Sequence, residues 1–178
     1  MAYPLRLDAA ATAAAARELV RAGGRQALSL RPLAASLGVR APSLYRYYPD
    51  RESLEGAVAE LAAAELADRM EGERKGRRGG AALKAIAGEY LAYSREEPAL
   101  FAMLLAAQPR PESKRLWNLL LAALEPVTGR ADDTAAAVAL WSFLHGFATL
   151  EAAGQFGASG PRGGYERGLS ALLAGLRL

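Results

Sequence analysis

The sequence contains no cysteine and only one histidine, and these absences remove most of the side chains that catalytic and metal sites use. Without cysteine the chain can form no disulfide, no thiolate nucleophile and no thiolate metal site. With a single histidine, a zinc site is not expected either. We therefore predict that the protein binds no metal, needs no cofactor and is not an enzyme.

Long apolar runs and strong net charge are also missing. No apolar run approaches the roughly eighteen residues that a membrane-spanning helix needs, and residues 1–8 lack the basic and apolar regions of a secretion signal. We expect a cytoplasmic protein without a membrane partner. The formal charge of +3 is small for 178 residues. Any affinity for a polyanion must therefore depend on where the arginines lie.

Alternating runs of β-branched and aromatic residues are absent, whereas alanine and leucine recur at helical spacing along the whole chain. This pattern predicts an all-α protein. Capping residues, glycines and prolines delimit four helices in the first part of the chain, at 8–23, 29–37, 42–48 and from 50 to about 70.

The second and third of these helices are short and are joined through Gly38, which is the layout of a helix-turn-helix. The apolar residues beside the turn would face the core, and the outward residues would be Arg40, Ser43, Arg46 and Tyr47. Arginine can reach bases or phosphates, and tyrosine hydroxyls can bond phosphate oxygens. Glycine-linked helix pairs are also common in proteins that bind no DNA, so spacing alone leaves both interpretations open.

The run "LSLRPLAASLGVRAPSLYRYYPDRESL" (28–54) resembles the DNA-binding region of the TetR family of bacterial transcription regulators. The positions that match the family pattern LA..LGV…LY.HF..K..L are Leu33, Ala34, Leu37, Gly38, Val39, Leu44, Tyr45 and Leu54. Tyr47, Tyr48 and Arg51 stand where histidine, phenylalanine and lysine are usual. The resemblance implies that the third helix contacts DNA. The contacts that it implies are Ser43, Tyr45, Arg46 and Tyr47 on that helix, Arg40 in the turn, and Arg31 and Arg51 on its flanks.

A charged, glycine-rich stretch, "EGERKGRRGG" (71–80), separates this region from the rest. We interpret it as a solvated linker, with a dedicated DNA-binding arm as the alternative. Periodic apolar residues beyond it predict about five more helices that form a bundle. We therefore expect a three-helix DNA-binding domain at residues 1–56. A long fourth helix would join it to a bundle for ligand binding and dimerisation at residues 57–178.

The predicted helix between 132 and 155 carries apolar or small residues on every side, so a small core cannot bury it alone. We predict that a second copy of the chain completes its burial. The expected dimer interface comprises Ala139, Ser142, Gly146, Thr149 and Ala153 on this helix and Leu169, Leu172, Leu173 and Leu176 on the last one.

Two further stretches, "LWSFLHGFATLE" (140–151) and "YSREEPALF" (93–101), resemble the regulatory domain of a TetR subgroup marked by Trp141, His145 and Gly146. This resemblance implies a domain that binds a small molecule and dimerises. The residues that we expect to line its pocket are Tyr90, Tyr93, Phe101, Leu104, Trp117, Leu121, Trp141, Leu144 and His145. His145 follows Ser142 at helical spacing, but no acid or oxyanion element accompanies the pair, so a core role or a ligand hydrogen bond is favoured over catalysis.

Together these patterns predict a homodimeric, ligand-responsive repressor that binds an inverted-repeat operator in double-stranded DNA and is released by a small apolar effector. One alternative is a ligand-binding or scaffold protein of the same fold that does not bind DNA. A small helical enzyme is the other, and it would need a reacting group that the sequence does not show.

Overall fold

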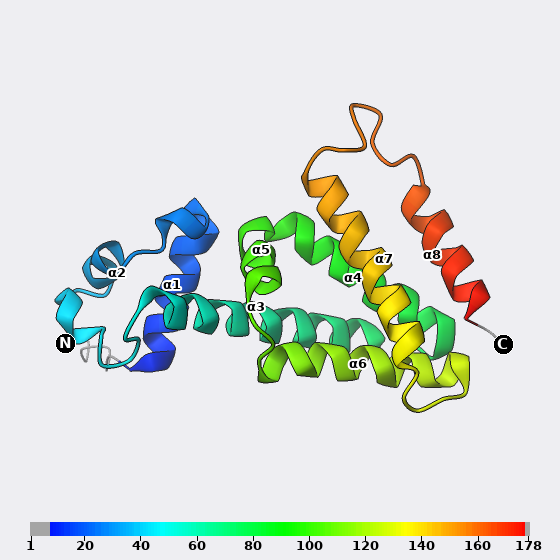
Figure 1. Ribbon diagram of the computed structural model, residues 1–178, viewed down its shortest axis with the longest axis horizontal. Helices are drawn as coiled ribbons and strands as arrows, with labels where there is room; N and C mark the ends of the chain where they lie inside the picture. The colour runs from blue at the N-terminus through cyan, green and yellow to red at the C-terminus, as the bar shows by residue number, and fades with distance from the viewer. Residues whose placement is uncertain (1–7, 177–178) are drawn as a thin grey trace. The chain divides into compact units, whose positions relative to one another are not determined.

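The computed structural model describes residues 8–176, and every regular element in that range is a helix (Figure 1). The all-α prediction is confirmed. The α-helices are α1 (Ala9–Gly23), α2 (Leu30–Ser36), α3 (Arg51–Arg74), α4 (Gly79–Glu96), α5 (Pro98–Ala106), α6 (Pro111–Thr128), α7 (Thr134–Ala152) and α8 (Gly164–Gly175). Two short 3-10 helices, η1 (Arg25–Ala27) and η2 (Ala41–Ser43), lie on either side of α2.

The chain forms two compact units that do not follow the order of the sequence. Unit 1 takes in the chain up to Ala63 together with Ala99–Pro111, and unit 2 takes in Ala64–Pro98 and the chain from Glu112 onward. Helix α3 therefore begins in unit 1 and ends in unit 2. Helix α5, which the sequence assigned to the second domain, belongs to unit 1 with α1 and α2.

Side-chain caps mark where α1 and α3 begin, whereas Ser29 before α2 makes no such bond. The Asp8 carboxylate accepts a hydrogen bond from the Ala11 N–H (2.8 Å), and the Asp50 carboxylate accepts one from the Ser53 N–H (2.7 Å). Each bond satisfies an N–H that the helix itself leaves free. Both caps are those that the sequence predicts.

The core of unit 1 is built from three parts of the chain that lie far apart in sequence. Its fully buried residues are Ala16, Val20, Leu28, Leu33, Leu44, Leu54, Val58, Ala62 and Leu100. Met103 from α5 packs among them at 3% exposure. Without α5 this core would be open to water on the side that Leu100 and Met103 cover.

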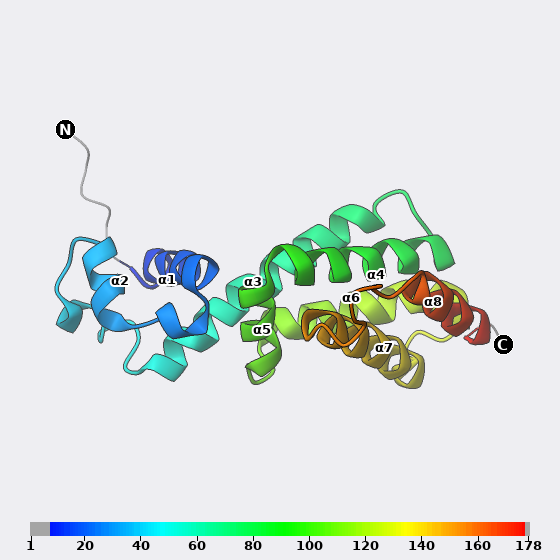
Figure 2. The same cartoon turned by 90° about the horizontal axis from the view of Figure 1, so that it is seen from above.

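Unit 2 is a helical bundle made from the end of α3 and from α4, α6, α7 and α8. Helix α7 packs on α4 and α8 packs on α7, which Figure 2 shows from above. The predicted linker at 71–80 is shorter than expected, because α3 continues to Arg74 and α4 begins at Gly79. Only residues 75–78 connect the two helices.

Helix α7 is apolar but poorly buried. By length and composition alone it could cross a membrane, contrary to the expectation from the sequence, yet the core helix of a soluble protein passes the same test. Only 33% of its most apolar stretch is buried in this chain. Val138 and Leu150 are 50% and 47% exposed. Much of this helix therefore faces away from its own bundle.

Candidate nucleic-acid and effector sites

Gly38 makes the turn between α2 and η2. Its φ is +65°, in the left-handed region that glycine adopts at little cost. The Gly38 N–H bonds the Ala35 carbonyl (3.2 Å) and the Val39 N–H bonds the Ala34 carbonyl (2.9 Å), which satisfies the last carbonyls of α2. The turn predicted from the sequence therefore stands where the helix-turn-helix needs it.

The third helix of the motif differs from the prediction. In place of an α-helix over 42–48, residues 41–43 form a 3-10 helix and 44–47 a hydrogen-bonded turn. The Tyr47 and Tyr48 N–H groups both bond the Leu44 carbonyl, at 2.9 and 3.0 Å. Pro49 disfavours helical backbone at Tyr48, and seven residues are few for a stable α-helix.

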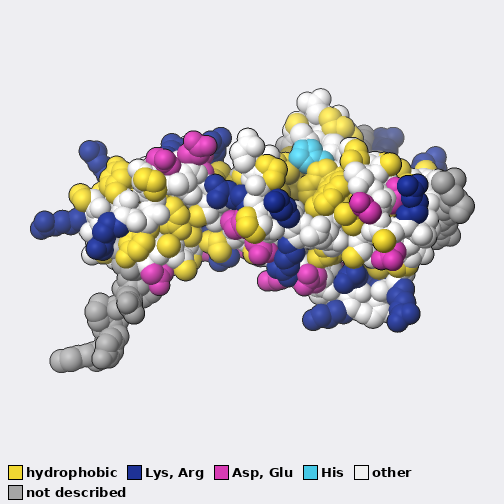
Figure 3. Space-filling model, turned by 60° about the horizontal axis from the view of Figure 1, so that its bottom comes forward, with side chains coloured by type: hydrophobic (Ala, Val, Ile, Leu, Met, Phe, Trp, Pro, Cys, Tyr) yellow, Lys and Arg dark blue, Asp and Glu magenta, His cyan; other side chains and the backbone are white. Residues whose placement is uncertain are grey.

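On this segment Tyr45 and Arg46 are exposed, whereas Tyr47 is half-buried. Tyr45 is 52% exposed, and Arg31, Arg40 and Arg46 are exposed cations that make no side-chain hydrogen bond or ion pair within residues 8–176. The Arg46 guanidinium lies over the Tyr47 ring, 5.7 Å from its centre. Ser43 is half-buried. Figure 3 shows Lys and Arg side chains projecting from this part of the chain.

A hollow of about 290 Å³ brings three of the predicted contacts together. Arg31, Tyr45 and Arg51 line it, with an apolar floor that includes Leu28 and Leu54. The arginines come from α2 and α3 and the tyrosine from the turn after η2. Two cations and a phenol around one hollow can hold a phosphate group.

Arg51 is less free than the sequence suggests. Its guanidinium donates to the Glu55 carboxylate (2.8 Å) and to the Arg25 carbonyl (3.0 Å). Arg25 donates to the same carboxylate at 3.1 and 2.7 Å. These bonds, with that from Arg25 the strongest, lower the pKa of Glu55 although burial opposes them. The sequence analysis did not predict the ion pair between Arg25 and Glu55. Arg51 and Glu55 are four residues apart, which is ion-pair spacing on a helix, but no local pattern indicates Arg25.

Tyr48 has a structural role. It packs against the core of unit 1, and its hydroxyl donates to the Ala9 carbonyl (2.9 Å). Burial, and then the neighbouring Asp8 carboxylate, raise the pKa of Tyr48, so the phenol keeps the proton that it donates.

A second hollow in unit 1, of about 640 Å³, has no counterpart in the sequence analysis. It is lined by Arg25, Arg51 and Glu55 on one side and by Met103, Gln108 and Arg110 on the other. The Arg110 guanidinium lies where a Cβ at Gly56 would stand, so a larger residue at that point of α3 would displace this side chain. This contact holds the end of the α5 segment on α3 within unit 1.

In unit 2, part of the predicted effector pocket comes together as an aromatic cluster. The Tyr90 ring meets Trp141 edge-on at 5.5 Å, and Trp141 meets Trp117 at 6.5 Å. The Tyr90 hydroxyl lies 3.5 Å from His145 Nδ1. Burial raises the pKa of Tyr90, so its hydroxyl stays protonated and available to a hydrogen-bond acceptor.

The other predicted pocket residues divide between the two units. Tyr93 and Leu144 are buried and Leu121 is half-buried in unit 2, where the Arg69 guanidinium lies 5.3 Å from the centre of the Tyr93 ring. Phe101 and Leu104 belong to unit 1, and Leu104 packs on the core formed with Leu100 and Met103. Leu104 was thus misassigned, because helical spacing shows that a residue is buried but not which helix covers it.

The predicted dimer face is largely accessible on α7. Ser142, Thr149 and Ala153 are exposed, Ala139 and Gly146 are half-buried, and a Cβ at Gly146 would meet nothing within 4 Å. On α8 the prediction needs correction. Leu169 and Leu173 are 4% and 3% exposed because they face their own bundle, which leaves the half-buried Leu172 and Leu176.

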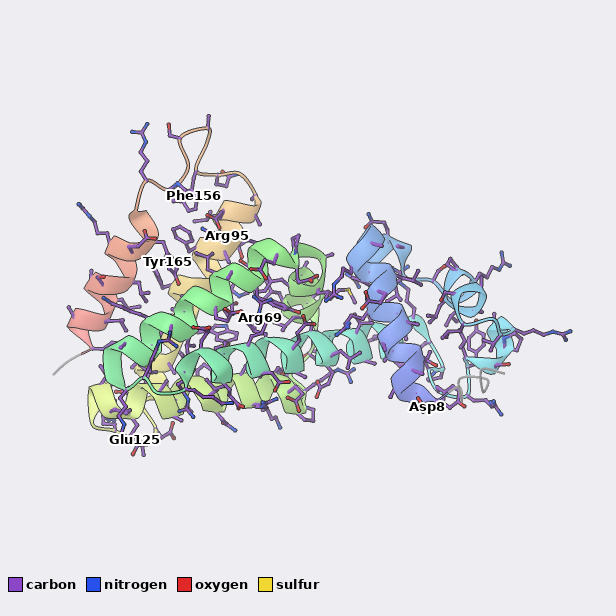
Figure 4. The ribbon with its side chains drawn as sticks, turned by 180° about the vertical axis from the view of Figure 1, so that it is seen from behind. Asp8, Arg69, Arg95, Glu125, Phe156 and Tyr165 are labelled. Carbon is purple, nitrogen blue, oxygen red and sulfur yellow. The ribbon has the colours of Figure 1, made fainter. Side chains whose placement is uncertain are left out.

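Beside this face, aromatic rings join α7 to α8 and to the loop between them. The Phe147 ring lies 4.9 Å from Phe156 and 5.0 Å from Tyr165. Arg95 on α4 donates to Glu151 on α7 at 2.6 and 2.7 Å. Figure 4 shows Arg95, Phe156 and Tyr165 gathered near this loop. The ring contacts hold α8 against α7, and the ion pair holds α4 against α7.

Comparisons with known proteins agree with this arrangement. No curated protein sequence matches the chain. Among solved structures, a protein of unknown function from Rhodococcus sp. RHA1 aligns with a TM-score of 0.78 at 21% identity, covering 99% of this chain and 100% of its own. A possible TetR family transcriptional regulator from Streptomyces coelicolor A3(2) aligns at 0.74 and 23%, with coverages of 96% and 98%. A TetR variant from Acinetobacter baumannii AYE in complex with minocycline aligns at 0.73 and 25%, with coverages of 97% and 99%.

Family models match both parts of the chain. Residues 13–58 match the model of bacterial regulatory proteins of the tetR family, and residues 83–173 match the tetracyclin repressor-like C-terminal domain. The second match alone spans just over half of the 178 residues. The chain therefore belongs to the TetR family and is a ligand-responsive, DNA-binding transcription regulator.

Proposed function

We propose that the protein is a repressor that binds an inverted-repeat operator as a homodimer and leaves it when a small apolar effector binds. The observation that carries the proposal is the set of exposed arginines around the helix-turn-helix that make no ion pair within residues 8–176, Arg31, Arg40 and Arg46. We place its action in the cytoplasm, where the operator is. A protein of this fold that had lost DNA binding would have no need for three uncompensated cations there.

The exposed face of α7 supports the homodimer. An apolar helix that its own bundle buries by only a third gains free energy when a second copy covers it. A two-fold dimer presents two identical DNA-binding units, so its site should be an inverted repeat.

The effector is proposed to bind at the cluster of Tyr90, Trp117, Trp141 and His145. Its rings offer apolar contact, and the Tyr90 hydroxyl and His145 imidazole offer one polar point that can orient a ligand. The TetR structure in complex with minocycline supports a small-molecule effector for this chain. Such an effector releases DNA only if it prefers the conformation that fits the operator less well.

The test is the affinity for DNA from upstream of the protein's own coding sequence, measured by fluorescence anisotropy. Arg46→Ala should weaken specific binding by about 1–3 kcal/mol and leave non-specific binding much less affected. Arg130→Ala, which removes an exposed arginine from unit 2, serves as the matched control. Equal operator affinities for the three proteins, each folded by circular dichroism, would contradict the assigned DNA contact.

A further inference from the structure

The end of α3 and the short connection to α4, residues 74–78, carry cations that the fold leaves without partners. Arg74, Lys75 and Arg78 make no side-chain hydrogen bond or ion pair within residues 8–176. The two acidic residues of this stretch are already engaged, Glu71 with Arg115 (2.9 Å) and Glu73 with Arg77 (3.3 Å). The connection therefore holds three uncompensated positive charges within five residues.

These cations surround a hollow with an apolar floor. Its volume is about 590 Å³, and its lining includes all three cations, the ion-paired Glu71 and Arg77, and the apolar residues Ala82, Ala122, Ala123 and Pro126. Glu125, labelled in Figure 4, neighbours Pro126 but does not line the hollow. Sites for small molecules have volumes of about 300–1,000 Å³ and combine apolar walls with a few polar groups.

We propose that this hollow binds a small organic anion, with an acidic headgroup held by Arg74, Lys75 and Arg78 and a hydrocarbon part on the alanine and proline floor. A phosphate or a carboxylate meets the charge requirement, because either forms charge-assisted hydrogen bonds to guanidinium and ammonium groups. The one acid in the lining, Glu71, is paired with Arg115 (2.9 Å), and the first turn of α4 contains no acidic residue. The hollow is separate from the proposed effector site, since no aromatic residue of the effector cluster lines the hollow.

Duplex DNA fits this surface less well than an organic anion does. The lining includes three alanines and a proline, and the sugar-phosphate backbone of DNA has no extended hydrocarbon chain to place on them. Desolvating alanine and proline is favourable only when an apolar group replaces the water. The three cations attract polyanions and small anions alike, whereas the alanine and proline residues favour an anion that carries a hydrocarbon group.

Isothermal titration calorimetry on the full chain tests the proposal. The probes are octyl phosphate, octanoate, octanol and inorganic phosphate. Octyl phosphate and octanoate are kept below the concentrations at which they form micelles. We expect octyl phosphate or octanoate to bind at least about tenfold more tightly than octanol and inorganic phosphate, because only the first two combine charge with hydrocarbon. The comparison of the first two identifies the headgroup. No binding of either would overturn the proposal.

Two variants examine the two halves of the site separately. Removing the charges with Arg74→Gln and Arg78→Gln together should weaken probe binding by about tenfold or more. Ala122→Leu, at an exposed position on α6, should fill the floor and weaken binding without changing charge. Arg130→Gln is the matched control and should bind as the unchanged chain does.

The outcomes separate the competing explanations. If both site variants bind the probes as the unchanged chain does, the hollow is not the site. If the double arginine variant loses affinity only for duplex DNA of random sequence, the connection is a DNA-binding arm and the proposal is wrong. Operator affinity measured on the same variants should stay unchanged, which keeps this result independent of the proposed repressor function.

Discussion

The substitution Glu55→Gln tests whether Arg25 and Arg51, which both bind the Glu55 carboxylate, contribute to DNA binding. Arg25 and Arg51 share the single Glu55 carboxylate, so the three groups together carry one positive charge. The two guanidiniums are 59% and 54% exposed, so a phosphate can approach both of them. Without the carboxylate the net charge rises to two. Arg25 and Arg51 then no longer have to leave an internal partner to bind phosphate.

The expected magnitude follows from counterion release. Each additional phosphate contact steepens the dependence of log K on log salt by about 0.9 for duplex DNA. One more effective contact in Glu55→Gln should therefore steepen the slope by about 0.9 and strengthen non-specific binding at low salt. Glu52→Gln removes the same charge from an exposed neighbour with no side-chain partner in the described chain, and should change the slope less.

The same substitution should change stability in a pH-dependent way. Hydrogen bonds from Arg25 and Arg51 hold the pKa of Glu55 below its ordinary value of 4.5. A lowered pKa contributes stability above pH 4.5 that is lost as the pH falls through the value in the folded state. Unfolding by urea should thus show Glu55→Gln less stable than the unchanged chain near neutral pH, with the difference shrinking below pH 4.5.

Anisotropy titrations at several salt concentrations decide the matter. If the slopes of Glu55→Gln, Glu52→Gln and the unchanged chain agree within error, Arg25 and Arg51 do not face phosphate. If stability differs by the same amount at all pH values, the ion pairs are not its source.

The remaining predictions concern the regulatory half. Gly146→Glu should shift the protein from dimer to monomer in sedimentation, because a charge on a buried interface costs several kcal/mol, whereas Thr134→Glu at the exposed start of α7 should not. An unchanged chain that sediments as a monomer at micromolar concentration would refute the dimer. Trp141→Ala should abolish effector response while operator binding of the free protein stays close to normal, and Trp141→Phe should keep part of the response. The measurement is calorimetric titration of an effector with and without operator, where a hundredfold coupling corresponds to about 2.7 kcal/mol, and equal affinities would contradict the switch.

Local signals in the sequence predicted the features that local chemistry controls. The caps at Asp8 and Asp50 and the turn at Gly38 depend on residues within three or four positions, and each lies where predicted. The prediction of an α-helix over residues 42–48 was wrong, and the cause is also local. Its pattern is helical, but the helix must end before Pro49. The few residues that remain form too few hydrogen bonds to offset the free-energy cost of nucleating an α-helix.

Features that depend on distant contacts could not be predicted. The Arg25 guanidinium meets Glu55 thirty positions away, so nothing near Arg51 shows that its charge is shared. Leu104 has the spacing of a buried residue, but spacing does not reveal that α5 covers unit 1. Leu169 and Leu173 form an apolar stripe that fits a partner subunit or its own bundle equally well, and burial shows that it serves the latter.

The contribution of α5 to the core of unit 1 bears on how this protein can be dissected. A fragment ending at Ala63 would contain the whole helix-turn-helix but would cut α3 between two turns and lose Leu100 and Met103. It would also lose Arg110, which lies against Gly56. This minimal DNA-binding fragment should therefore be poorly packed and prone to aggregation. Shorter reagents built from this chain need residues 99–111 supplied through a new covalent connection.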